Sequence, residues 1–144
     1  MDVLLVEDEA PIREAVGEGL RSAGFDVLTA SSAEEALAAM GDRAWPRVVV
    51  ADLTLGDGMD GLRFAAEARR RWPGIGVVYA TGRPDLFEGR VLGPAERYVL
   101  KPYTSAALLQ VVRRVMPRNL QRCAMDQIWQ KGTTRNLSLP VREP

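Results

Sequence analysis

Short apolar runs alternate with longer segments of helical periodicity through most of the chain. The apolar runs predict strands at residues 3–6, 25–30, 48–51, 76–80 and 98–100. Between them, apolar side chains recur every three or four positions, which predicts helices that begin at Pro11, after Ser32, at Gly61 and after Thr104 or Ser105. Such alternation is typical of a parallel sheet covered by helices on both faces.

The second predicted strand, residues 25–30, is the most polar of the five. Asp26 and Thr29 interrupt its apolar side chains, whereas the other runs are apolar throughout. A strand of mixed polarity suits the edge of a sheet, and continuous apolar runs suit its centre. We therefore expect an α/β fold, a doubly wound five-stranded parallel sheet in the order 2-1-3-4-5, rather than a barrel.

Residues 82–97 depart from this alternation. The segment should contain the fourth helix, but Pro84, Gly89, Gly93 and Pro94 interrupt it. Proline and glycine both disfavour a helix interior. We therefore expect the fourth helix to be short, irregular or absent.

The end of the chain, residues 117–144, is predicted to be an extension that follows a domain of residues 1–116. Leu120, Ala124 and Ile128 are spaced to form an apolar stripe on one short helix. The extension is too short for a winged helix or another full DNA-binding domain. We interpret it as a disordered or packed extension, with a second hypothesis that Leu120, Ile128 and Trp129 bury against a second chain in a homodimer.

Composition narrows the classes of partner. The 144 residues match one domain and leave little room for an effector domain. Nineteen basic residues balance nineteen acidic ones, so no overall field draws the protein to nucleic acid or to an anionic membrane. No apolar run approaches the length of a membrane span. We expect neither direct DNA binding nor membrane association.

The chain contains no histidine and a single cysteine, Cys123. The lack of histidine excludes imidazole bases, serine–histidine–aspartate triads and histidine-bound zinc. A single cysteine cannot form an intramolecular disulfide, which indicates a reducing compartment and a cytoplasmic protein. Any chemistry must therefore use carboxylates, hydroxyls and amines.

Three acids follow the ends of two predicted strands. Glu7 and Asp8 directly follow the first strand, and Asp52 follows the third. These strands are neighbours in the expected order, at the point where the winding direction reverses and open sheets bind ligands. Two carboxylates about 4 Å apart repel by roughly 4 kcal/mol at an effective dielectric of about 20, so the cluster needs a cation. Mg²⁺ fits best, because the ligands on offer are oxygens.

A hydroxyl and an ammonium follow the other two strands. Thr81 comes directly after the fourth strand, and Lys101 after the fifth. Together with Mg²⁺ they would neutralise the oxygens of a tetrahedral dianion, which predicts a phosphoryl group as the ligand. Asp52 is the central acid, and a carboxylate can attack phosphorus to give an acyl phosphate.

Each of these residues has an ordinary structural interpretation when taken alone. Asp8 or Glu9 could cap the following helix. Asp52 could form an Asx turn, Thr81 a turn before glycine, and Lys101 a solvated surface charge. The arrival of all of them at one edge of the sheet favours a phosphoryl site.

The motifs around these residues resemble the receiver domain of two-component response regulators. The resemblance covers about residues 1–116 and is carried by four short motifs: Val6-Glu7-Asp8-Glu9, Asp52-Leu-Thr-Leu, Ala80-Thr81-Gly82 and Tyr98-Val-Leu-Lys101-Pro102-Tyr103. It implies a stand-alone signalling switch that changes its protein contacts when phosphorylated. The implied donor is a histidine kinase or a histidine phosphotransfer protein, and the downstream protein is not identified.

The resemblance also implies a set of metal ligands. Asp52 would be the phosphoacceptor. Asp8 and Asp52 would bind Mg²⁺ through their carboxylates, joined by the backbone carbonyl of Thr54, and Glu7 would act largely through water.

Four further side chains receive roles from the resemblance. Lys101 would hold the phosphoryl group, Thr81 would swing in to bond it, and Tyr98 would turn inward behind Thr81. The side chains of Thr54 and Arg83 would tune the lifetime of the phosphorylated state. Such a domain assists its own phosphorylation and dephosphorylation and is otherwise not an enzyme.

One loop departs from the family pattern. Gly56 replaces the usual proline four residues after the phosphoacceptor, and the loop that reaches Gly61 is one residue longer than the common spacing. We therefore expect an unusual shape for residues 55–60.

Two other functions remain open at this point. A magnesium-dependent phosphohydrolase of the aspartyl-phosphate kind uses the same chemistry, but typically has a second acid where Thr54 stands and carries cap insertions. A vestigial receiver that acts only as an interaction module would share the fold.

Overall fold

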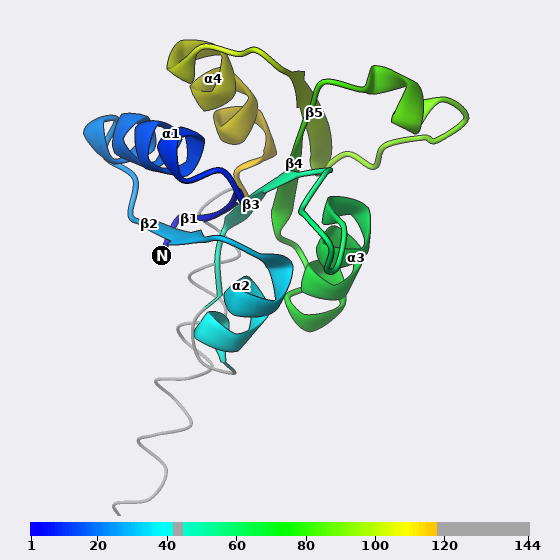
Figure 1. Cartoon of the computed structure of the whole chain (residues 1–144), viewed down its shortest axis with the longest axis horizontal. Coiled ribbons are helices and arrows are strands. Elements are labelled where there is room, and N and C mark those ends of the chain that lie inside the picture. The colour runs from blue at the N-terminus through cyan, green and yellow to red at the C-terminus, as the bar shows by residue number, and fades with distance from the viewer. Residues whose placement is uncertain (42–44, 118–144) are drawn as a thin grey trace, which may run out of the picture.

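The computed structural model describes residues 1–41 and 45–117, and within them five parallel strands form one sheet (Figure 1). The strands are β1 Val3–Val6, β2 Val27–Ala30, β3 Val48–Asp52, β4 Gly76–Thr81 and β5 Glu96–Leu100. Their order is β2-β1-β3-β4-β5, and every neighbouring pair is parallel. The predicted fold class and strand order are confirmed.

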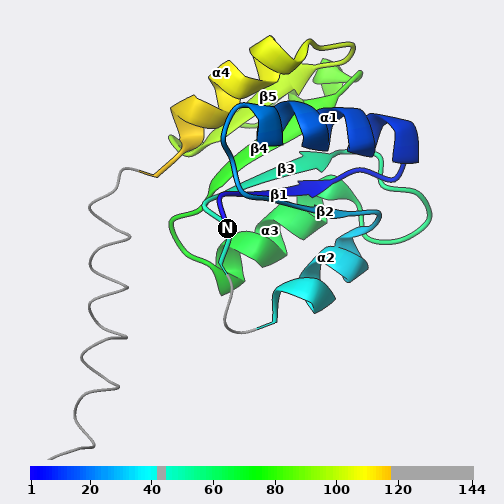
Figure 2. The same cartoon turned by 90° about the vertical axis from the view of Figure 1, so that its left-hand side faces the viewer.

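Helices cover both faces of this sheet. They are α1 Ala10–Ser22, α2 Ala33–Met40, α3 Gly61–Arg71 and α4 Ser105–Val115. Figure 2 shows α1 and α4 on one face and α2 and α3 on the other. None of these helices, nor any other among the described residues, is long and apolar enough to cross a membrane.

The sheet has two cores because successive side chains of a strand point to opposite faces. In β1, Leu4 and Val6 pack in the cluster under α2 and α3. Val3 and Leu5 pack in the cluster under α1 and α4. All residues of β1, β3 and β4 are buried, and these strands are apolar apart from Asp52 and Thr81 at the ends of β3 and β4.

Side-chain caps fix where three helices begin. The oxygen atoms of Ser32, Asp60 and Thr104 accept the backbone N–H groups three residues later, at 3.0, 2.8 and 3.1 Å. Thr104 rather than Ser105 is therefore the cap of α4. The Glu35 carboxylate accepts the backbone N–H of Ser31 rather than that of Ser32, so Ser32 and Glu35 do not form a reciprocal capping box.

The segment between β4 and β5 contains no α-helix. A single short 3-10 helix, η1 Pro84–Phe87, is followed by irregular backbone up to β5. Gly89 has a φ of 75°, which turns the chain directly after this element. Figure 1 shows the segment as a loop that projects beside the edge of the sheet. The prediction that the fourth helix is short, irregular or absent is confirmed.

Two strands begin at other residues than predicted. β2 starts at Val27, because the Phe25 amide donates to the Leu20 carbonyl and completes the end of α1. β5 starts at Glu96, where a buried carboxylate accepts a hydrogen bond from Tyr79 at 2.8 Å. The hypotheses about the extension concern Leu120, Ala124, Ile128 and Trp129, which lie outside the described residues.

Candidate functional site

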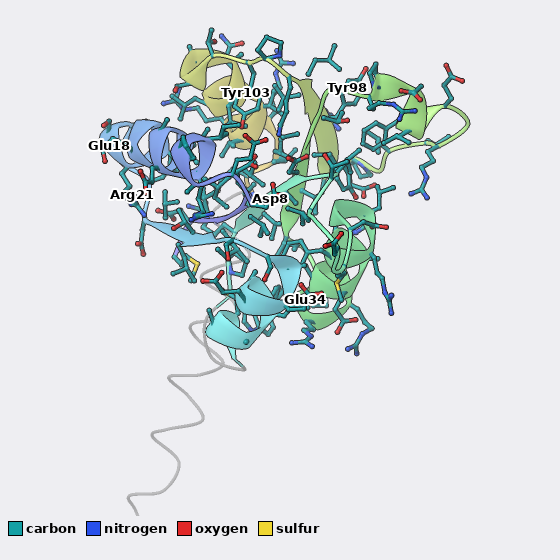
Figure 3. The ribbon with its side chains drawn as sticks, in the orientation of Figure 1. Asp8, Glu18, Arg21, Glu34, Tyr98 and Tyr103 are labelled. Carbon is teal, nitrogen blue, oxygen red and sulfur yellow. The ribbon has the colours of Figure 1, made fainter. Side chains whose placement is uncertain are left out.

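Three carboxylates meet where β1 and β3 end. β1 and β3 pair from Val3 to Val6, so Glu7 follows β1 directly beside Asp52, the last residue of β3. Each of Glu7, Asp8 and Asp52 places one oxygen within 4.8 Å of the others. Glu7 and Asp52 are buried, whereas Asp8, which is labelled near the centre of Figure 3, is exposed. The predicted acid cluster therefore forms.

Lys101 lies against two of these acids. Its Nζ is 2.6 Å from Asp52 Oδ2 and 3.3 Å from Glu7 Oε2. Lys101 follows β5, and the peptide bond between Lys101 and Pro102 is cis. The ammonium thus partly compensates the negative charge of the cluster, which still has more acids than bases.

The second oxygen of Asp52 is held by the loop that follows it. Asp52 Oδ1 accepts hydrogen bonds from the Thr54 backbone N–H at 3.0 Å and from Thr54 Oγ1 at 3.2 Å. Gly61, the first residue of α3, passes so close to the Asp52 carbonyl that a Cβ there would lie 2.2 Å from the oxygen. Only glycine fits this approach, and it brings the start of α3 against the backbone of Asp52.

The pKa values of Glu7 and Lys101 are both raised, but for different reasons. Burial raises the pKa of Glu7 above its ordinary value, even though the Glu9 amide and the Lys101 ammonium favour the charged carboxylate. For Lys101 burial alone would lower the pKa, but the hydrogen bond and charge of Asp52 outweigh it and the pKa is raised. Lys101 is therefore a fixed positive charge at neutral pH.

Thr81 completes the same edge of the sheet. It is the last residue of β4 and is buried. Its backbone carbonyl accepts the Lys101 amide at 2.8 Å, and its Oγ1 accepts the Arg83 amide at 2.8 Å. Thr81 is therefore joined through its backbone to the residue that carries the ammonium, and its hydroxyl is engaged by the chain that follows β4.

The side chains of Tyr98 and Arg83 contact residues outside the acid cluster. The Tyr98 side chain is 43% exposed and stacks on Phe87 with ring centroids 5.2 Å apart, on the side of the loop after β4 (Figure 3). The inward position that the resemblance implies for Tyr98 is therefore not the one in this structure. Arg83 pairs with exposed Asp85 at 2.6 Å.

Two residues near the site were missed by the sequence analysis. Arg13 of α1 donates to the Glu7 carbonyl at 2.9 Å and so steadies the backbone of the acid cluster. Tyr103 lies with Lys101 and Ile12 in a groove of about 570 Å³ between α1 and α4. Burial and the charge of Glu7 raise the pKa of the Tyr103 hydroxyl group. Helical periodicity assigns Arg13 to solvent, and only the folded chain brings it over Glu7.

The arrangement suits a hard cation. The donor atoms are oxygens of Glu7, Asp8 and Asp52, and no histidine exists in the chain to favour a softer metal. Two of the acids are buried and carry the same charge, and a divalent ion would reduce the repulsion between them. The acid cluster can therefore hold a metal ion.

Comparisons with known proteins agree with this geometry. The family model described as the response regulator receiver domain matches residues 3–113 of this chain. The response regulator protein FleR of Pseudomonas aeruginosa is 34% identical over 114 residues, which are 78% of this chain and 24% of FleR. The probable transcriptional regulatory protein TcrX of Mycobacterium tuberculosis is 34% identical over 119 residues, 81% of this chain and 50% of TcrX.

A solved structure gives the same result in three dimensions. The receiver domain of NtrX from Brucella abortus superposes with a TM-score of 0.70 and 33% identity, over 79% of this chain and 97% of that domain. This chain spans half or less of the length of the two curated relatives, whose names describe whole regulators. The chain therefore belongs to the response regulator receiver domain family, which consists of signalling modules.

Proposed function

We propose that this protein is a phosphoacceptor switch that takes a phosphoryl group on Asp52. The observation that carries the proposal is the meeting of the Asp52 carboxylate with the Lys101 ammonium, 2.6 Å away, and with two further acids. Residues 49 positions apart in the chain form this contact, which is what an anion site between strand ends requires.

The proposed step transfers a phosphoryl group from a histidine nitrogen of the donor to a carboxylate oxygen of Asp52. A lone pair of an Asp52 carboxylate oxygen attacks the phosphorus of a phosphohistidine. The P–N bond breaks, and its electron pair stays on the imidazole nitrogen of the donor. The product is an acyl phosphate, and Lys101 moves its ammonium from the free carboxylate to the new phosphoryl oxygens.

Mg²⁺ is the proposed cofactor. Asp8, Asp52 and the backbone carbonyl of Thr54 would hold it, with Glu7 acting through water. When bound, Mg²⁺ supplies positive charge that offsets the charge of the acids and of the phosphoryl oxygens. Asp8 is the exposed member of the cluster and offers the ion an entry from solvent.

Thr81 and Tyr98 are the proposed switch residues. The Thr81 hydroxyl, which now accepts from Arg83, would donate to the phosphoryl group. Tyr98 would leave Phe87 and turn toward the space behind Thr81. A covalent dianion can select between two such arrangements that differ by a few kcal/mol. Thr54 and Arg83 would tune how long the phosphoryl group persists.

The proposed donors are a histidine kinase or a histidine phosphotransfer protein, and the output is an altered contact with a downstream protein. The predictions of no direct DNA binding, of cytoplasmic location and of a domain boundary at residue 116 remain predictions. A homodimer through residues 117–144 remains one as well. Sedimentation of the full chain and of a chain that ends at Pro117 tests it, because a dimer through the extension requires the shorter chain to lose mass beyond the deleted residues.

Within the described residues, no observation favours a phosphohydrolase or a vestigial module. Thr54, which stands where such hydrolases typically have a second acid, is a hydrogen-bond donor to Asp52. Phosphoacceptor function therefore remains the single proposal.

Intact-protein mass spectrometry tests the proposal directly. We expect the chain to gain one phosphoryl group after incubation with acetyl phosphate and Mg²⁺, and Asp52→Asn to gain none. Asp57→Asn is the matched control, because Asp57 is an exposed acid of the same loop. Lack of an adduct on the unaltered chain, or an adduct that survives Asp52→Asn, contradicts phosphorylation at this residue.

A further inference from the structure

The loop between β3 and α3 is fastened to α2 by one carboxylate. Glu34 Oε1 accepts the backbone N–H of Met59 at 2.8 Å. The same carboxylate lies on the backbone of Gly58, where a Cβ would come within 2.8 Å of Oε1 and 3.0 Å of Oε2. Glu34 is in the first turn of α2, and Figure 3 labels it beside that helix, lower in the view than Asp8.

The fastened loop passes the acid cluster. A Cβ on Gly56 would lie 4.0 Å from Asp8 Oδ2, and Gly56 has a φ of 52°, which favours glycine. Thr54 ties the start of the loop to Asp52, and Asp60 caps α3 at its end. The backbone between these anchors therefore borders the acid cluster at Asp8.

Among the described residues, the contact with Glu34 is the hydrogen bond that joins the later part of this loop to another element, at Met59 directly before the Asp60 cap. The loop is one residue longer than the family's common spacing, and Gly56 stands where proline would stiffen it. A longer chain with glycine has more conformations to lose, so an external tether has more effect on its position. The Met59 N–H lowers the pKa of Glu34, with a smaller effect from the charge of Arg63, and the carboxylate is charged at neutral pH.

We propose that Glu34 is a positioning residue for the phosphoacceptor site: it holds residues 55–59 against the acid cluster and so limits the access of water to a phosphoryl group on Asp52. The inference rests on the proposed function. Hydrolysis of the acyl phosphate forms a bond from a water oxygen to phosphorus and breaks the bond from phosphorus to the Asp52 oxygen. The products are inorganic phosphate and the free carboxylate. Release of the loop opens the path of that water.

Four variants separate this role from a general effect on α2. Glu34→Ala removes the acceptor, and Glu34→Gln keeps an oxygen that can accept the Met59 N–H. Gly58→Ala places a methyl group where the carboxylate lies and displaces this flexible side chain while the glycine's own backbone stays in place. Glu35→Ala is the matched control, since Glu35 is the next residue of the same turn and bonds to Ser31 instead.

Two measurements are made on each full-length variant. The first is the decay of the phosphoryl adduct in Mg²⁺ after removal of acetyl phosphate. We expect Glu34→Ala and Gly58→Ala each to shorten its lifetime by about two- to tenfold, the fold-change that corresponds to one hydrogen bond. Their combination should shorten it no further, because both remove the same contact. Glu34→Gln and Glu35→Ala should match the unaltered chain.

The second measurement is amide hydrogen exchange of residues 55–59 without phosphodonor. We expect faster exchange in Glu34→Ala and Gly58→Ala and no change in Glu35→Ala, with similar melting temperatures throughout. Equal lifetimes in Glu34→Ala and the unaltered chain, additive effects in the double variant, or an equal effect of Glu35→Ala would each overturn the positioning role. If the unaltered chain forms no adduct, the proposed function fails and this role fails with it.

Discussion

At the scale of single residues, the site depends on the groups that compensate the negative charge of the Asp52 carboxylate. Asp52 Oδ2 accepts a hydrogen bond from the Lys101 ammonium, and Asp52 Oδ1 accepts hydrogen bonds from the backbone N–H and the hydroxyl of Thr54. Glu7 shares the same ammonium through a longer contact of 3.3 Å. A single cation therefore serves two buried carboxylates, and its loss would leave both without an opposite charge.

We predict that Lys101→Ala lowers the free energy of unfolding by about 2–3 kcal/mol, because it leaves two buried charges uncompensated. Chemical denaturation at neutral pH without divalent ions measures this change. Arg114→Ala is the control, since Arg114 is an exposed cation of α4 and should cost no more than about 0.5 kcal/mol. Equal stability of Lys101→Ala and the unaltered protein would show that the contact contributes nothing.

At the scale of elements, the segment between β4 and β5 is anchored by an aromatic side chain instead of a helix. Phe87 is 8% exposed, and its ring lies between Tyr79 of β4, with centroids 5.3 Å apart, and Tyr98 of β5. Farther along, Glu96 Oε2 accepts the Gly93 amide at 2.8 Å. The irregular segment is thus tied to the sheet at two points, one of which involves the proposed switch residue Tyr98.

Phe87→Ala should therefore destabilise the protein by about 2–4 kcal/mol, through lost burial and lost ring contacts. The neighbouring Leu86 is 40% exposed, so Leu86→Ala should cost less than about 1 kcal/mol. Denaturation curves of the two variants provide the comparison. A loss for Leu86→Ala as large as that for Phe87→Ala would mean that the aromatic contacts do not anchor the segment.

At the scale of the whole molecule, the sheet order creates the site. Three acids, a threonine and a lysine come from the ends of four strands, and they meet because all strands run in one direction. The concentration of negative charge at that edge destabilises the empty site. Stability and ion binding are therefore linked throughout the molecule.

We predict that Mg²⁺ at ten times its dissociation constant raises the free energy of unfolding by about 1.4 kcal/mol, and that chelation removes the gain. The Asp8→Asn variant should lose most of this gain in the free energy of unfolding, because the substitution removes one carboxylate from the cluster. Asp57→Asn should keep it, since Asp57 is outside the cluster. Thermal melting across a magnesium titration distinguishes these cases, and an equal gain in Asp8→Asn would place the ion elsewhere.

The sequence by itself determined the elements, the strand order and the position of the site. Apolar runs and helical periodicity depend on neighbours along the chain, so the buried strands and their helices could be predicted. The ends of β1, β3, β4 and β5 placed Glu7, Asp8, Asp52, Thr81 and Lys101 at one edge, and the fold brings them there. Pro84 and Gly89 likewise predicted the irregular segment.

Only the tertiary structure decided which distant partners these residues have. The outward position of Tyr98 on Phe87, the contact of Arg13 with the Glu7 carbonyl and the bond of Glu34 to Met59 join different elements. No local pattern encodes such pairs, because packing of whole elements sets the distance between their side chains. Periodicity shows which face of a helix is buried, but the exposed face meets its partners only when the sheet has formed.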